Sequence, residues 1–134
     1  MKKILLFALI IGGALFVASC TKQYNQVVPN QTIIFDLKSS DWGSADGGKN
    51  DTVVLKAPQI DKFFNQSGAV LVSLTFDNGA TYEPIPYVFD NVNYSYIYTE
   101  GAIELFAQSS DGTAVIPIPP ASSAKVTFVP ADLN

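Results

Sequence analysis

Carboxylates are the main side chains in this sequence that could act as acids or bases. The 134 residues include 12 Asp and Glu but no His, which excludes Ser–His–Asp and Cys–His catalysis within the chain. Glu100 and Glu104 could share a strand face, but four residues of strand would separate them by about 13 Å. A glycosidase pair needs roughly 5 to 9.5 Å, so solvated surface carboxylates are the simpler interpretation unless Glu83 or Asp90 lies closer in the fold. We expect no enzyme, and a small carboxylate-dependent hydrolase is the third hypothesis for function.

The single cysteine, Cys20, has the sequence context of a lipid attachment site. Residues 1–3 are basic, and residues 4–17 are uncharged but too few for the roughly 20 residues of a membrane-spanning helix. The segment formed by Val17, Ala18, Ser19 and Cys20 resembles the lipobox of bacterial lipoproteins. In that motif the cysteine sulfur takes a diacylglyceryl group and the chain is cut before the cysteine, so that two or three acyl chains anchor the protein stably. The alternative is an ordinary signal peptide with an incidental cysteine.

These features divide the chain into three parts. We expect residues 1–19 to be the signal peptide, residues 20–30 to be the lipidated cysteine with a short tether, and residues 31–134 to form one domain. Thr21 differs from the Asp of an inner-membrane retention signal, and residues 21–25 lack the acidic cluster that resembles a Bacteroidota surface-export signal. An outer-membrane anchor facing the periplasm is therefore the first expectation, and display on the cell surface is the second.

Charge and composition exclude several partner classes. The chain has no Arg and a formal net charge of −4, so it is poorly suited to nucleic acid, whose phosphates dominate binding. Zinc sites that use imidazole or a thiolate cluster are excluded, because there is no His and only one Cys. We expect no cofactor. The remaining partners are the membrane, through the N-terminal lipid, and an envelope protein or glycan.

The acidic, glycine-rich loop at residues 41–51 offers oxygen atoms that calcium could use. It lacks the alternating ligands and the closing Glu of an EF-hand, and Lys49 opposes a bound cation. We therefore expect an ordinary connecting loop and no metal, with calcium as the alternative. Next to this loop, Asp51-Thr52-Val53 resembles the short O-glycosylation sequence of Bacteroidota, which makes Thr52 a possible modification site.

Aromatic residues suggest a second kind of binding site. Trp42, Tyr94, Tyr96 and Tyr98 could form a ligand platform, and Tyr82 and Tyr87 lie nearby in sequence. Aromatic faces stack on the C–H surfaces of sugars, while neighbouring Asp or Asn side chains bind hydroxyls. The alternative is that the rings fill the core and keep their hydroxyls at its rim. Solvent exposure of the rings distinguishes a ligand platform from rings that fill the core.

Alternation of apolar and polar residues predicts about eight short strands. They cover residues 33–38, 52–56, 70–77, 81–89, 92–98, 103–107, 114–116 and 125–129. Asn78-Gly79 predicts a type I′ turn, and Pro84 and Pro86 place the strand after it at a sheet edge or on a bulge. Residues 58–65 predict one or two turns of helix, with Ile60 and Phe63 or Phe64 closing one end of the sheets.

These elements favour two antiparallel sheets packed face to face, since no helix alternates with the strands at crossover length. We expect an all-β antiparallel sandwich, Ig-like or jelly-roll-like, with one short helix and a lipoprotein signal peptide before it. A barrel is the alternative.

The order of five short segments resembles a family of small Bacteroidota lipoproteins that has no assigned activity. The segments are residues 38–42, 57–60, 68–72, 82–87 and 125–130. The resemblance implies a lipid-anchored β-sandwich and supplies no catalytic residue. The first functional expectation is therefore a non-enzymatic binding or interaction module of the cell envelope, and an accessory of surface glycan capture is the alternative.

Overall fold

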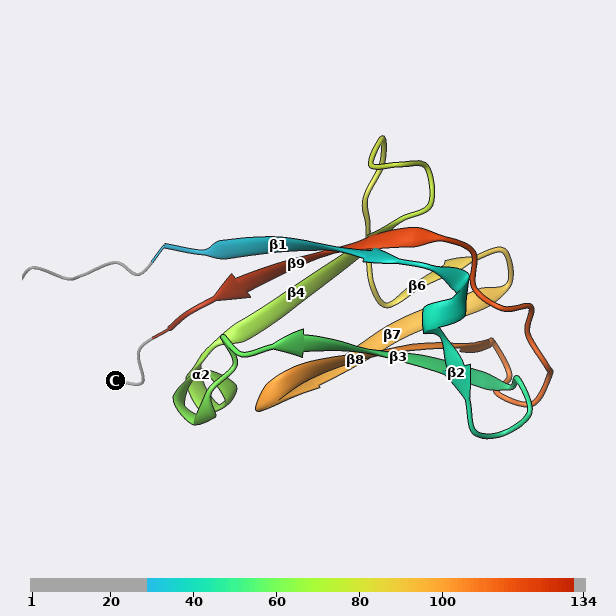
Figure 1. Cartoon of the computed structure of the whole chain (residues 1–134), viewed down its shortest axis with the longest axis horizontal. Coiled ribbons are helices and arrows are strands. Elements are labelled where there is room, and N and C mark those ends of the chain that lie inside the picture. The colour runs from blue at the N-terminus through green and yellow to red at the C-terminus, as the bar shows by residue number, and fades with distance from the viewer. Residues whose placement is uncertain (1–28, 132–134) are drawn as a thin grey trace, which may run out of the picture.

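The structure, a computed structural model, describes residues 29–131 and is an antiparallel β-sandwich (Figure 1). One sheet has the strand order β1 (Gln31–Leu37), β9 (Ser122–Val129), β4 (Ala69–Thr75) and β5 (Glu83–Pro84). The other has the order β2 (Gly43–Ser44), β3 (Asn50–Ala57), β8 (Gly101–Ser109), β7 (Val92–Thr99) and β6 (Tyr87–Phe89). The predicted sandwich is thus confirmed, and the two sheets do not close into a barrel.

The predicted signal peptide, Cys20 and the first part of the tether lie outside the described residues. Within residues 29–131, no helix is long and apolar enough to cross a membrane.

The core lies between the two sheets, where alternate residues of each strand turn inward as their period of two requires. Strands β4, β9 and β8 each have a neighbouring strand on both sides, and their inward side chains are buried. These residues are Val70, Val72, Leu74, Ala124, Val126, Phe128, Ile103, Leu105 and Ala107. The predicted inward faces of these strands are confirmed.

The chain between β4 and β7 departs from the predicted hairpin. Asn78 and Gly79 adopt positive φ angles of 58° and 87°, as the predicted turn requires. The strand expected at residues 81–89 is instead two short strands in different sheets, with β5 paired only through Ser73–Pro84 and Leu74–Glu83. Both lie at sheet edges, which confirms the position expected from the prolines, since proline has no N–H for a second neighbour.

One end of the sandwich is closed by helix α2 (Lys62–Ser67) (Figure 1). The helix begins later than predicted, because the Asp61 carboxylate accepts a 2.7 Å hydrogen bond from the Phe64 N–H and caps it there. Ile60 is 1% exposed, and Phe64 packs edge-on against Phe128 with ring centroids 6.0 Å apart. Phe63 is exposed, so Ile60 and Phe64 are the residues that close this end of the core.

The loop between β8 and β9 contains no strand, so the strand expected at residues 114–116 is wrong. Its Ile116 is buried, and the Ile116 N–H donates to the Gly48 carbonyl oxygen at 2.8 Å. The apolar run therefore anchors a loop instead of extending a sheet. A short 3-10 helix, η2 (Ser39–Asp41), connects β1 to β2.

The chain enters β1 and leaves β9 at the same end of the sandwich, because Gln31 pairs with Phe128 (Figure 1). At the other end of the same sheet, Leu37 pairs with Ser122 and Thr75 pairs with Ser123. That second end carries the candidate site.

Candidate functional site

The aromatic residues proposed as a ligand platform lie largely inside the sandwich. Trp42 and Tyr94 are 8% and 1% exposed, and their rings meet edge-on with centroids 6.1 Å apart. Burial raises the pKa of Tyr94 to about 12, and the Asp90 and Asp51 carboxylates add to the effect. The platform hypothesis is therefore wrong for this set, because buried rings offer no face to a ligand.

Tyr96 and Tyr98 belong to the same inward face of β7, and both are partly buried against the core. The Tyr96 hydroxyl donates a 2.6 Å hydrogen bond to the Val70 carbonyl oxygen in the other sheet. Burial, followed by the neighbouring Tyr98, raises the pKa of Tyr96. Both rings pack against the core, and Tyr96 keeps its hydrogen-bonded hydroxyl at the rim, in agreement with the alternative interpretation.

The acidic loop proposed for calcium is organised by one carboxylate. Asp46 Oδ1 accepts hydrogen bonds from the Ser44 hydroxyl at 2.9 Å and from the N–H groups of Lys49 and Asn50 at 3.1 and 3.0 Å. These bonds, the one from Asn50 first, lower the pKa of Asp46. Within the described part of the chain, no group of three or more His, Cys, Asp or Glu side chains is placed to hold a metal ion. The structure thus assigns Asp46 to holding the turn between β2 and β3.

The remaining predicted residues lie apart from one another. Glu100 is exposed at the turn between β7 and β8, whereas Glu104 lies on the outer face of β8 between Val54 and Ile97. Thr52 is partly buried on the outer face of β3, opposite Gly43 and Phe106. Its glycosylation stays a prediction. The lipobox residues Val17, Ala18, Ser19 and Cys20 precede residue 29 and are not described.

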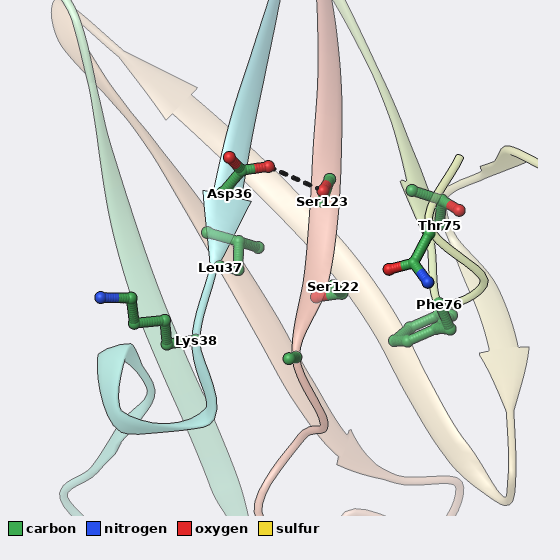
Figure 2. A pocket seen from close by; sticks show the side chains of 9 residues that line it. Asp36, Leu37, Lys38, Thr75, Phe76, Ser122 and Ser123 are labelled. Atoms are coloured by element: carbon green, nitrogen blue, oxygen red, sulfur yellow. Dashed lines mark hydrogen bonds between the residues drawn. The ribbon is translucent and has the colours of Figure 1, made fainter.

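A pocket of about 260 Å³ opens at the end of the four-stranded sheet, opposite the end where the chain enters. Figure 2 shows that its walls come from three neighbouring strands, with Asp36 on β1, Ser123 on β9 and Thr75 on β4. The complete lining is Asp36, Leu37, Lys38, Thr75, Phe76, Asn78, Ala121, Ser122 and Ser123. Sites for drug-sized ligands usually measure roughly 300–1,000 Å³, so this pocket suits a small ligand or one unit of a longer chain.

Hydrogen bonds fix part of this lining. Ser123 Oγ donates to Asp36 Oδ1 at 2.9 Å, which joins β1 to β9 (Figure 2). Thr75 Oγ1 donates to Asp77 Oδ1 at 2.7 Å and accepts from the Gly79 N–H at 3.0 Å. The Thr75 hydroxyl therefore has little capacity left for a ligand.

The other polar groups of the lining differ in their accessibility. The buried Ser122 hydroxyl oxygen has no hydrogen-bond partner within residues 29–131, an arrangement that ordinarily costs free energy. The side chains of Lys38 and Asn78 are exposed at the rim. The lining thus combines polar side chains with the apolar Leu37 and Phe76, and it contains one Asp and one Lys.

A second cavity, of about 170 Å³, lies on the other side of Thr75 and Phe76. Phe76 stacks on Phe89 with centroids 4.2 Å apart and planes 5° apart, so its ring is held in one orientation. The second cavity includes the carboxylates of Asp77 and Glu83. Both Asp77 oxygens accept hydrogen bonds from Thr75 or Thr81, so this carboxylate supports the loop and is poorly placed for chemistry.

Sequence reasoning did not identify the pocket. Its residues come from segments around positions 36, 75 and 122, and no short motif joins them. The Asn78-Gly79 pair is a local signal for a turn, and this turn places Asn78 in the lining of the pocket.

Comparisons with known proteins identified no relative of this chain. No family model matches the chain, and neither a curated protein nor a solved structure matches it. The fold and the pocket therefore define the class of the protein as an antiparallel β-sandwich with a small polar site at one end.

Proposed function

We propose that this protein is a lipid-anchored, non-enzymatic binding module of the cell envelope, of the kind that the resemblance to Bacteroidota lipoproteins implies. The pocket between the ends of β1, β9 and β4 is its binding site. The observation that carries the proposal is the lining of this pocket, in which the polar side chains of Asp36, Lys38 and Asn78 lie beside the apolar Leu37 and Phe76.

The position of the pocket suits a protein held by its N-terminus. The tether leads into β1 at Gln31, and the pocket begins at Asp36, near the other end of that strand. Five residues of strand correspond to about 17 Å. The lipid and the ligand would therefore occupy separate ends of the four-stranded sheet.

The chemistry of the lining favours a neutral ligand rich in hydroxyl groups. Serine hydroxyls, an amide and a carboxylate all bind hydroxyls, and the Phe76 ring supplies an apolar surface. This lining supports the second candidate, a role in glycan capture. It does not favour a hydrolase, since the pocket lining contains a single carboxylate, Asp36.

A matched pair of variants tests the binding site. Asn78 and Asn91 are both exposed and both have positive φ, so each can become glycine without backbone strain. In a screen of mono- and oligosaccharides against the purified full-length lipoprotein, Asn78→Gly should weaken binding by about tenfold, whereas Asn91→Gly should not change it. Equal effects of the two variants, or no bound saccharide, would contradict the glycan proposal.

Protease treatment of intact cells tests the location. We place the protein on the periplasmic face of the outer membrane first and on the cell surface second. Proteinase K should leave it intact until the outer membrane is broken, with a periplasmic protein as the control. Digestion on intact cells would instead place it on the surface and strengthen the case for glycan capture.

A further inference from the structure

Within residues 29–131, three of the four edge strands are very short and one is long. The edge strands β2 and β5 are two residues long and β6 is three residues long, and β5 contains Pro84. Short strands and prolines are the usual means of preventing a sheet edge from pairing with another chain. β1 is also an edge strand, yet it has seven residues and contains no Pro, Gly or Lys.

The side chains of β1 also have incomplete cover. Ile33 and Phe35 face the core but are only partly buried, because β9 is the single strand paired with β1 within residues 29–131. On the outer face, Ile34 is 56% exposed. A strand added to this edge would cover the flanks of all three side chains and occupy the unpaired backbone groups of β1.

We infer that a second copy of this chain adds its own β1 to this edge, antiparallel, so that the two four-stranded sheets become one continuous sheet. The inference does not rest on the pocket or its ligand, although the paired strand includes Asp36 and Leu37 of the pocket lining. It follows from the self-complementary sequence of the strand, Gln31–Leu37, whose central residue is the exposed Ile34.

Only one register pairs all seven residues of both strands, and it places Ile34 opposite Ile34 of the second copy. In this register Ile33 lies opposite Phe35 on the inner face, so the apolar side chains continue the core. On the outer face Thr32 lies opposite Asp36 of the other copy, which pairs a hydroxyl with a carboxylate. The Asp36 carboxylates of the two copies are therefore kept apart. A shift of the centre to residue 33 or 35 would leave two residues of each strand unpaired.

The lipid anchor is compatible with this pairing. Antiparallel strands place the two tethers at opposite ends of the strand pair, about 20 Å apart. Ten residues of extended tether reach roughly 33–36 Å, so both lipids can enter one bilayer. Confinement of both copies to a membrane also raises their effective concentration.

Engineered disulfides in the full-length lipoprotein test the register. Opposed residues of antiparallel strands have Cα atoms about 4.5–5.5 Å apart, within the roughly 4.4–6.8 Å that a disulfide spans. Ile34→Cys should therefore form a disulfide-linked dimer in isolated membranes after mild oxidation. Thr32→Cys is the matched control on the same strand face, because the two Thr32 positions would lie about 13 Å apart, and the unsubstituted protein controls for Cys20.

At least a tenfold excess of dimer for Ile34→Cys over both controls is expected. Equal yields for Ile34→Cys and Thr32→Cys, no dimer for either, or a disulfide between Ile34→Cys and a different protein would overturn the inference.

A second pair of variants tests association without a cysteine. Ile34→Lys would bring two like charges together on the two-fold axis, whereas Val54→Lys introduces the same charge at an equally exposed position, 59%, on the outer face of the other sheet. In sedimentation of the detergent-solubilised full-length protein, the unsubstituted protein and Val54→Lys should be dimeric and Ile34→Lys monomeric. A monomeric unsubstituted protein, or a dimeric Ile34→Lys, would overturn the inference. Circular dichroism shows whether each variant is folded.

Discussion

The Tyr96 hydroxyl of the five-stranded sheet donates a 2.6 Å hydrogen bond to the Val70 carbonyl oxygen of the four-stranded sheet. The bond compensates for the short edge strand β5. The Ile85 N–H reaches the Val72 carbonyl at 3.1 Å, and the Val70 carbonyl points to the same side two residues earlier, where β5 does not extend. Tyr96 of one sheet therefore provides the hydrogen-bond donor that the Val70 carbonyl oxygen of the other sheet lacks from β5.

Removal of this hydroxyl should destabilise the fold. Tyr96→Phe leaves the Val70 carbonyl without its partner, which should lower the free energy of unfolding by about 1–2 kcal/mol. Tyr98→Phe is the control, because Tyr98 lies on the same face of β7 and is similarly part-buried. Urea denaturation of both variants measures the difference, and equal losses would show that the cross-sheet bond contributes nothing specific.

The space around helix α2 gives a second prediction. A Cβ atom at Gly68 would lie 2.8 Å from the Phe64 ring, which itself packs against Phe128. Gly68→Ala should therefore displace the Phe64 ring and lower the free energy of unfolding by about 1–3 kcal/mol. Gly43→Ala, where a Cβ atom would meet nothing within 4 Å, should change stability by less than about 0.5 kcal/mol. Thermal unfolding distinguishes the two, and a neutral Gly68→Ala would show that Phe64 is not fixed in the core.

Acid should weaken the loop between β4 and β5. Hydrogen bonds from the Thr81 N–H and hydroxyl, and then from the Thr75 hydroxyl, lower the pKa of Asp77 from 3.8 to about 2. Since the pKa is lower in the folded state, the stabilisation is fully present above about pH 4 and is lost as the pH falls towards 2. The pKa of Asp111 is lowered in the same direction by the Thr113 N–H and the Ser109 hydroxyl.

The melting temperature should therefore fall between about pH 4 and pH 2, and the fall should be smaller for Asp77→Asn, which has no carboxylate to protonate. Glu100→Gln, at the exposed turn between β7 and β8, should keep the acid profile of the unsubstituted protein. An unchanged acid profile for Asp77→Asn would contradict this role for the carboxylate.

Local sequence signals predicted much of the fold. The alternation around Val70, Val72 and Leu74 identified the inward face of β4, and the Asn78-Gly79 pair predicted a turn whose φ angles are both positive. The sequence did not reveal that residues 81–89 divide between two sheets, because that division depends on which distant strands offer a free edge.

The candidate site was beyond prediction for a related reason. Asp36 and Ser123 are 87 positions apart in the chain and become neighbours only through the pairing of β1 with β9. The register between distant strands depends on the whole core and not on a local pattern. The alternation of Tyr94, Tyr96 and Tyr98 on one face was recognised from the sequence, and their burial was one of the two interpretations it allowed.

The most direct test of the proposed function is mass spectrometry of the N-terminal peptide from the mature protein purified from its native membranes. We expect a chain that begins at Cys20, with a diacylglyceryl thioether on the sulfur and an acyl group on the new amine, and no processed form for Cys20→Ser. A mature chain that begins elsewhere, or that carries an unmodified Cys20, would contradict the lipid anchor and with it the proposal of a membrane-held binding module.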